Sequence, residues 1–279
     1  MPLSRRHVLA GGAVTAALVG ARSTAHAATA WNFNDPQTAL DAYVRMRNRD
    51  DGKKSYTRYS GTFFAKVEGE TAVPILGIEG MSWGTCKRQD DGTYVYSMQE
   101  AGYHTRLGTT EIVDEWDNPI TGATVQPRHY RSGQTSVFAP GAVLRPNAPP
   151  VEGLEFKGVI SPITVIGDTA WGSEDLYVKF PNPRERYNDE QEWSGPFRVA
   201  NSLATHSALV ADIINADRDF VPSTMAYTTL NSWRPWMKMG QTPGIISWRL
   251  KGRKFESADE IGDWLLDRVA NDHPDLLEA

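Results

Sequence analysis

Two basic side chains flank an indole in the segment WRPWMKMG, residues 233–240. If this segment is a strand, Arg234, Trp236 and Lys238 share one face, because side chains alternate between the two faces of a strand. A guanidinium and an ammonium group beside an indole would hold a carboxylate, phenolate or phosphate while stacking an aromatic ring. The alternative is a solvated outer face on which Trp236 covers a strand end. The pattern leaves both alternatives open.

Histidines near the ends of predicted strands are candidates for acid–base chemistry. His104 and His129 each have a tyrosine beside them in the sequence, and histidine is the most frequent general acid or base in enzymes. Neighbouring strand residues point to opposite faces, so His129 and Tyr130 cannot both face a barrel interior without a bulge. We therefore expect His129 to be the general base, with its partner on another strand. Further catalytic candidates are His104, Glu79 and Glu100, and further substrate-binding candidates are Trp83 and Tyr130.

No motif indicates a metal, a nucleotide cofactor or a covalent nucleophile. The histidines show neither the H-E-x-x-H nor the H-x-H spacing of zinc ligands, and neither G-x-S-x-G nor a dinucleotide-binding glycine fingerprint is found. Cys86 is the only cysteine, so an internal disulfide cannot form. A metal site assembled from distant strands stays open. We expect neither a metal nor an organic cofactor.

The first residues predict export. The segment SRRHVLA, residues 4–10, carries a pair of arginines, an uncharged apolar run continues to Ala21, and A-x-A occupies residues 25–27. This is the pattern of a twin-arginine signal peptide over residues 1–27. Its apolar run of about 14 residues is shorter than the about 20 needed to cross a bilayer. We expect cleavage before Ala28 and a periplasmic or secreted protein.

The charge of the mature chain narrows the class of partner. Loss of the three arginines of the leader reduces the basic residues from 29 to 26 against 34 acidic ones, a net charge of about −8. Such an acidic chain argues against nucleic acid or an anionic membrane as partner. We expect a small-molecule ligand and no integral membrane span.

Most of the mature chain has the pattern of strands. Residues 61–67, 73–83 and 93–104 are rich in β-branched and aromatic residues and are separated by turn-forming sequences. Residues 199–213 instead carry apolar residues at spacings of four and three, which predicts an amphipathic helix. Two further helices are predicted by Asp35-Pro36 at an N-terminus and by a capping box of Ser257 and Glu260.

The balance of these elements predicts the fold. About nine strands against three helices, without regular alternation, argue against a parallel α/β fold. An antiparallel sheet of this length has to close or fold onto itself to remove its edges. We predict one domain over residues 28–279, mainly β with a few helices: an antiparallel β-barrel of the lipocalin or dirigent type with helices covering the ends. A barrel of about eight strands can hold one small ligand.

Four segments carry a resemblance to a known family. They are GIEGM at residues 77–81, NPITGATV at residues 118–125, FPNP at residues 180–183 and WRPWMKMG followed by QTPG. On these segments the chain resembles domain-of-unknown-function family 1838, whose members are often exported. The sequence departs from that family after NPITGATV, where His129 is followed by YRSGQTSVF rather than by asparagine, aspartate and proline. The resemblance implies no activity.

Together these patterns predict an exported protein that binds a small, partly aromatic or anionic molecule in a barrel pocket. The expected activity is that of a cofactor-independent acid–base lyase or isomerase, with His129 as base and Arg234 and Lys238 anchoring negative charge. The alternative is a periplasmic carrier that uses the same pocket without turnover. A carrier needs apolar walls and one anchor, whereas a catalyst needs at least two converging titratable groups.

Overall fold

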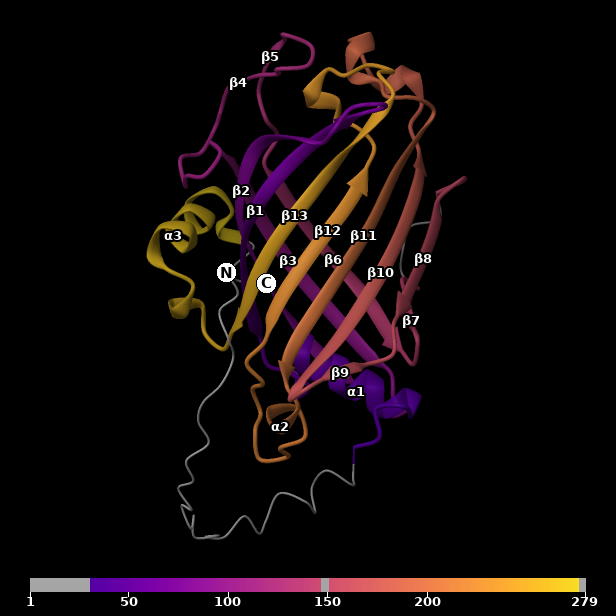
Figure 1. Cartoon of the computed structure of the whole chain (residues 1–279), viewed down its shortest axis with the longest axis vertical. Helices are drawn as coiled ribbons and strands as arrows, with labels where there is room; N and C mark the ends of the chain where they lie inside the picture. Colours follow the sequence, from indigo (N-terminus) through magenta and orange to yellow (C-terminus); the bar gives the residue numbers. More distant parts are fainter. Residues whose placement is uncertain (1–30, 147–150, 276–279) are drawn as a thin grey trace, which may run out of the picture.

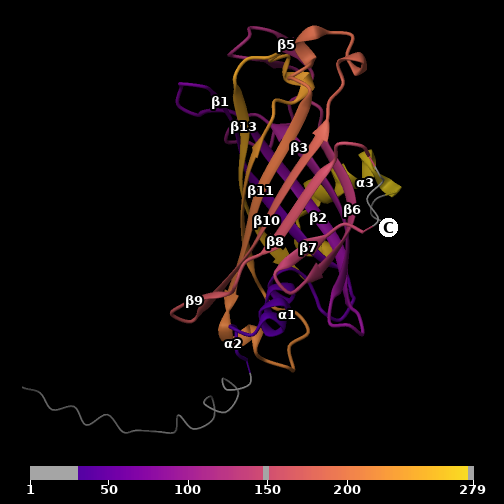
Figure 2. The ribbon, with the colours of Figure 1, turned by 90° about the vertical axis from the view of Figure 1, so that its right-hand side faces the viewer.

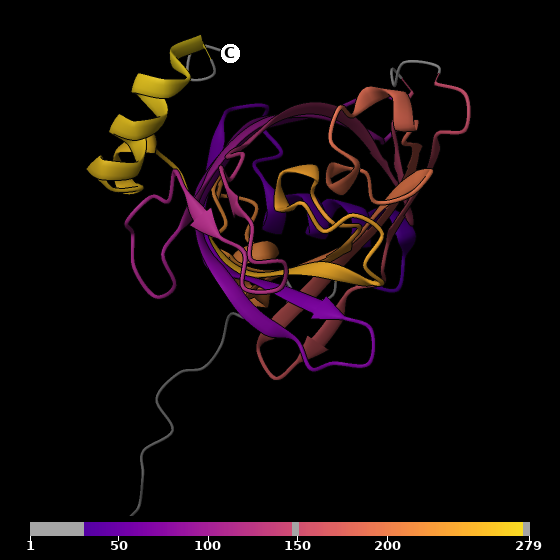
Figure 3. The ribbon, with the colours of Figure 1, turned by 90° about the horizontal axis from the view of Figure 1, so that it is seen from above.

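Ten antiparallel strands form a nearly closed barrel, shown from the side in Figure 1 and from above in Figure 3. The computed structural model describes residues 31–146 and 151–275, so the expected signal peptide lies outside the described residues. Around the barrel the strands run in the order β7-β6-β3-β2-β1-β13-β12-β11-β10-β8, and β9 pairs with β10. The predicted antiparallel, mainly β fold is confirmed.

The barrel strands differ widely in length. They are β1 (Ser55–Val67), β2 (Val73–Arg88), β3 (Tyr94–Thr105), β6 (Tyr130–Ala139), β7 (Ala142–Leu144), β8 (Glu155–Ile160), β10 (Thr169–Pro181), β11 (Phe197–Leu209), β12 (Thr224–Asn231) and β13 (Gly244–Phe255). The additional strands are β4 (Trp116–Asp117), β5 (Thr124–Val125) and β9 (Thr164–Ile166). The first and last strands of this order, β7 and β8, lie close together, and the N–H of Ile160 donates to the carbonyl oxygen of Gly141 at 3.2 Å.

The barrel interior is lined by more small and polar side chains than an ordinary core. On β3, Glu100 faces the interior, whereas Tyr103 packs outward beneath the C-terminal helix. The residues paired with Glu100 on the two neighbouring strands are Ser82 and Ser132. These short side chains do not fill the centre of the barrel, so a lumen is left open beside the Glu100 carboxyl group.

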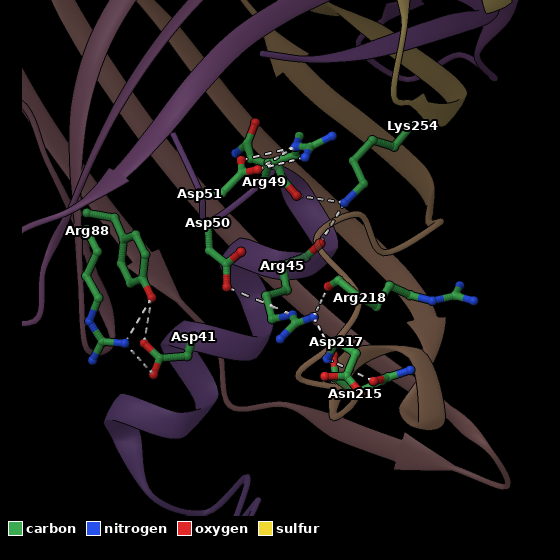
Figure 4. A network of polar contacts seen from close by, with 12 residues as sticks. Asp41, Arg45, Arg49, Asp50, Asp51, Arg88, Asn215, Asp217, Arg218 and Lys254 are labelled. Carbon is green, nitrogen blue, oxygen red and sulfur yellow. Dashed lines mark hydrogen bonds and ion pairs between the residues drawn. The ribbon is translucent and has the colours of Figure 1, made fainter. Parts of the chain in front are cut away.

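The helix α1 (Pro36–Arg47) covers the lower end of the barrel, as Figure 1 and Figure 2 show. Asp35 caps its N-terminus by accepting from the N–H of Thr38 at 2.8 Å. At its C-terminus, Lys254 of β13 donates from Nζ to the carbonyl oxygens of Arg45 at 2.6 Å and Asn48 at 2.7 Å. Figure 4 shows this polar anchor. It fixes α1 so that Arg47, its last residue, lines the lumen.

The helix α3 (Asp263–Asp272) lies against the outer wall rather than over an end (Figure 3). Its buried residues Leu265 and Val269 pack on Met81 and Trp83 of β2. The predicted capping box is present, but it caps the 3-10 helix η4 (Ala258–Glu260) ahead of α3. None of the helices in the described parts of the chain is both long and apolar enough for a membrane crossing.

The helix predicted over residues 199–213 is wrong. Most of that segment is β11, and only α2 (Val210–Ile213) is helical. Of the residues that suggested a helix, Val199 and Leu203 lie on the outer face of β11 and His206 lies on its inner face. Leu203 points to the outside and is 41% exposed, whereas His206 points inward and is 3% exposed. Apolar residues four apart lie on one face of a helix but also on one face of a strand. When the inner face of a strand is polar, its apolar outer residues can therefore be mistaken for the apolar face of a helix.

The strand considered for residues 233–240 does not form, because β12 ends at Asn231 and a 3-10 helix, η3 (Pro235–Met237), follows. At the upper end of the barrel, a hydrogen bond from the β4–β5 connection fixes η3. There the Nδ2 group of Asn118, between β4 and β5, donates to the carbonyl oxygen of Met237 at 2.7 Å. The remaining 3-10 helices, η1 (Arg184–Arg186) and η2 (Glu190–Glu192), lie in the connection between β10 and β11.

Candidate active site

The barrel contains two neighbouring spaces. A cavity of about 200 Å³ lies in the lumen, and a wider space of about 1040 Å³ forms the mouth, which the β4–β5 hairpin and η3 border at the upper end. Tyr130, Arg234 and Trp248 line both spaces. These three side chains therefore stand where the two spaces adjoin.

Glu100 is the carboxyl group at the centre of the candidate site. Burial raises its pKa to about 7, although the hydroxyl of Tyr59 and the charge of Arg47 act in the opposite direction. The ring of Tyr59 lies across Gly80 and Gly102, where an added Cβ atom would stand 2.4 Å and 2.8 Å from the tyrosine. Two glycines on neighbouring strands thus create the slot that brings Tyr59 beside Glu100. A carboxyl group with a pKa near neutrality can both accept and donate a proton.

Two further tyrosines share the lumen with Glu100. Burial raises the pKa of Tyr130 to about 12 and raises that of Tyr227 as well, and the charge of Glu100 adds to both shifts. The ring of Tyr130 meets that of Trp248 edge-on, with centroids 5.3 Å apart. Both hydroxyl groups therefore stay protonated near neutral pH and are hydrogen-bond donors within the same cavity.

Three of the arginines that line the lumen and the mouth are central to the site. Arg145 and Arg234 line the lumen, and Arg198 and Arg234 line the mouth. None of the three lies within ion-pair distance of a carboxylate in the described part of the chain. Burial lowers the pKa of each guanidinium group from its ordinary value. Arg234 also lies over the ring of Trp248, 5.1 Å from its centroid.

Several buried polar atoms around these arginines have no hydrogen-bond partner among the described residues. Buried polar groups in folded proteins are normally paired, so a cluster of unpaired ones marks a place where water or a ligand binds. The unpaired atoms that border the two spaces are Arg47 Nε, Asn48 Nδ2, the Tyr59 hydroxyl oxygen, His104 Nδ1, Arg145 Nε, Arg198 Nε, Asn231 Oδ1 and Trp248 Nε1.

An ion pair forms the floor of the lumen. Arg47 of α1 lies 3.1 Å from the Glu174 carboxylate of β10, and both side chains are largely buried. The same guanidinium contacts Nε2 of His206 at 3.0 Å. Burial lowers the pKa of His206, and the charge of Arg47 lowers it further. The imidazole is therefore neutral and accepts the hydrogen bond from Arg47, and the charge of Glu174 is compensated within the protein.

The two predicted histidines lie at the mouth. Their rings are stacked with centroids 5.8 Å apart. The backbone N–H of His104 donates to Nδ1 of His129 at 3.3 Å, and Nε2 of His129 lies 3.7 Å from the Asp114 carboxylate. Burial lowers the pKa of both imidazoles, to about 3 for His104. Because Nδ1 of His129 accepts from this N–H, its lone pair is not free to take a substrate proton in this arrangement.

The three candidates from residues 233–240, Arg234, Trp236 and Lys238, lie in different surroundings. Arg234 reaches the lumen, whereas Trp236 and Lys238 line only the mouth. Trp236 meets His104 edge-on at 5.1 Å between centroids. Lys238 adopts a left-handed backbone conformation, with φ of 53°, and pairs with Asp189 at 3.1 Å. The charge of Lys238 is thus already compensated, unlike that of Arg234.

Glu79 and Trp83 lie on the side of β2 that faces α3. Glu79 lies 3.5 Å from the Arg58 guanidinium, which also donates to the carbonyl oxygen of Ile261 at 2.8 Å. Trp83 belongs to the cluster packed beneath α3 and also borders the lumen. Of the predicted residues, the structure therefore brings Glu100, Tyr130 and Arg234 together in the lumen, with Trp83 at its wall, and places Glu79 with the outer helix.

Sequence reasoning missed most of the residues that complete the lumen. One signal existed for the strand residues, because polar side chains at a spacing of two, as in Tyr227, Thr229 and Asn231, mark a polar inner face. No comparable signal identified Arg145, which follows β7 in a proline-rich stretch. The polar partners come from strands far apart in the chain.

Within residues 31–146 and 151–275, no group of three or more His, Cys, Asp or Glu residues could hold a metal ion. Comparison with curated proteins finds no match. The sequence profile of a family described as protein of unknown function (DUF1838) matches residues 52–279, a span that contains the whole barrel from β1 onward. The chain belongs to this family.

Proposed function

We propose that this protein is an exported enzyme that binds a small, partly aromatic or anionic molecule in the barrel lumen and catalyses proton-transfer chemistry of the lyase or isomerase type. The observation that carries the proposal is Glu100, a carboxyl group inside the lumen whose pKa is raised to about 7 by burial. A group with such a pKa exchanges protons efficiently near neutral pH.

The lumen supplies the other parts that such a reaction needs. The guanidinium groups of Arg145 and Arg234 would hold the acidic group of the substrate and stabilise the negative charge that develops when Glu100 removes a proton from carbon. The hydroxyl groups of Tyr130 and Tyr227 would donate to the same oxygen atoms. Returning the proton to a different carbon gives an isomerase, and expelling a leaving group gives a lyase. His129 remains a candidate at the mouth, where it would contact the substrate on entry.

The reaction is tested by hydrogen exchange. We expect the protein in D₂O to replace a carbon-bound hydrogen next to the acid group of its substrate with deuterium, as followed by NMR over a panel of small organic acids. Glu100→Gln should slow this exchange by a factor on the order of 10² or more, because an amide cannot accept the proton. His129→Gln is the matched comparison.

The outcomes separate the two functional classes. Equal rates for Glu100→Gln and the unaltered protein would contradict the role of Glu100, and a loss in His129→Gln alone would return the role of base to His129. Saturable binding in the lumen without exchange or turnover for any bound acid would instead identify a periplasmic carrier.

The proposed export of the protein is inferred from the leader sequence. We expect the exported form to have the intact mass of a chain that begins at Ala28, because the A-x-A motif sets the cleavage site. Replacement of Arg5 and Arg6 by lysine should retain the precursor in the cytoplasm. Recovery of the full-length chain outside the cytoplasm would contradict this prediction.

A further inference from the structure

The charges of the lumen and the mouth specify more about the ligand than that it is an anion. Six basic residues line the mouth, Arg128, Arg131, Arg186, Arg198, Arg234 and Lys238, against the two acidic residues Glu115 and Glu192. Arg131 pairs with Asp275 at 2.6 Å and Lys238 with Asp189 at 3.1 Å, so four of the six have no ion-pair partner among the described residues. The whole chain has a formal net charge of −5, so this end of the barrel has the opposite sign to the molecule. A cleft lined by one sign of charge concentrates ligands of the other sign.

Inside the lumen, the carboxylates do not compensate all of the positive charge of the arginines. Glu174 pairs with Arg47 at 3.1 Å, so these two charges cancel. Glu100 is the remaining carboxyl group of the lumen, and with a pKa of about 7 it is only partly ionised at neutral pH. Arg145 and Arg234 are therefore the lumen arginines without a carboxylate partner, and Arg198 lies at the mouth. A buried charge without a counter-charge is costly, and a bound anion removes this cost.

We propose, on the basis of the function inferred above, that the ligand is a small organic dianion, a dicarboxylate or a phosphate monoester, with its two negative charges at Arg145 and Arg234. The unpaired Nε atom of Arg145 and the unpaired indole nitrogen of Trp248 border the same cavity and supply donors to the oxygen atoms of the anion. A single negative charge would leave one of the two guanidinium groups uncompensated. A lumen of about 200 Å³ restricts the ligand to a small molecule.

The test compares pairs of probes that differ by one negative charge. Phenyl phosphate carries close to two negative charges above pH 7, whereas phenyl sulfate carries one; isophthalate and benzoate form the corresponding carboxylate pair. We expect at least one dianion to bind about tenfold or more tightly than its monoanionic counterpart in calorimetric titrations at pH 7.5, because it pairs with one more charge. The two pairs also distinguish a phosphate ester from a dicarboxylate.

Variants locate the binding site. Arg145→Gln and Arg234→Gln should each weaken binding of the dianion by about tenfold and affect the monoanions less. Arg249→Gln is the matched control, because Arg249 is an exposed arginine that stacks on Phe64 with 4.2 Å between the guanidinium carbon and the ring centroid. The melting temperatures of the unliganded Arg145 and Arg234 variants should equal or exceed that of the unaltered protein, which excludes misfolding as the cause.

Each result bears on one proposal. Equal affinity within both probe pairs, no binding of either dianion at millimolar concentration, or unchanged affinity in both lumen variants would overturn the dianion inference. Exchange that depends on Glu100 with monoanionic acids, without preference for a second charge, would overturn it and leave the proposed enzyme intact. Dianion binding that survives in Glu100→Gln, without turnover in the unaltered protein, would support the inference and reject the enzyme.

Discussion

Glu100→Gln should stabilise the unliganded protein by about 3 kcal/mol at pH 8 and hardly at all at pH 4. The pKa of Glu100 is about 7 in the folded state against an ordinary value of 4.5. The folded state therefore binds the proton more tightly than the unfolded state. Below pH 4.5 the carboxyl group is protonated in both states, and between pH 4.5 and 7 folding stability falls as pH rises. Above pH 7 the full penalty of ionising Glu100 in the folded protein remains.

The measurement is the free energy of unfolding in urea at pH values from 4 to 8. The curve of the unaltered protein should fall relative to that of Glu100→Gln between pH 4.5 and 7, because glutamine copies the neutral carboxyl group at every pH. Glu152→Gln, which changes an exposed glutamate, is the control and should run parallel to the unaltered protein. Parallel curves for Glu100→Gln as well would mean that Glu100 is not desolvated.

The stability cost of ionising Glu100 bears on the function of this carboxyl group. A protein that gained stability by losing Glu100 would be maintaining the carboxyl group for a purpose other than folding, which is typical of catalytic and binding sites. The hydrogen-exchange test examines the reaction, whereas the pH dependence of unfolding examines only the environment of Glu100. Agreement between the two would join the unusual carboxyl group to the chemistry of the lumen.

The barrel could be predicted from local sequence, because strands that alternate in polarity and lie close along the chain pair as hairpins. The meander from β1 to β3 follows this rule. Local patterns failed where the lumen is polar. On β11 the inward positions include Ser202, Ala204 and His206, so the residues that should mark the buried face are small or polar. The apolar outer residues then determined the apparent period and suggested a helix.

The candidate site could be predicted only in part. Glu100, Tyr130 and Arg234 were identified by residue type, but the sequence does not show which carboxyl groups become desolvated. That property depends on neighbours from other strands, such as Ser82 and Ser132 beside Glu100. His129 illustrates the opposite case. Its residue type suits a base, yet the contacts of both ring nitrogens arise from the β3 backbone and from Asp114, which no local pattern reveals.

Glu174→Gln should destabilise the protein by about 3–5 kcal/mol, because removing one partner of a buried ion pair leaves the other charge uncompensated. Glu174 is 4% exposed, and its carboxylate lies 3.1 Å from Arg47. Arg47 would keep its contact with His206 and the rings of Tyr96 and Phe138, whose centroids lie 4.9 Å and 5.8 Å from the guanidinium carbon. None of these replaces a carboxylate. The melting temperature and the urea midpoint should both fall.

Two further variants show whether the loss of stability in Glu174→Gln is caused by breaking the ion pair with Arg47. Glu155→Gln removes a carboxylate that pairs with Lys179 at 2.8 Å on the surface, and it should change the unfolding free energy little, because solvent screens exposed pairs. In the double variant Glu174→Gln with Arg47→Met no unpaired charge remains, so much of the stability lost in Glu174→Gln should return. If the double variant is as unstable as the sum of the two single variants, the two side chains contribute independently. The floor of the lumen would then be held by packing of α1 rather than by the ion pair.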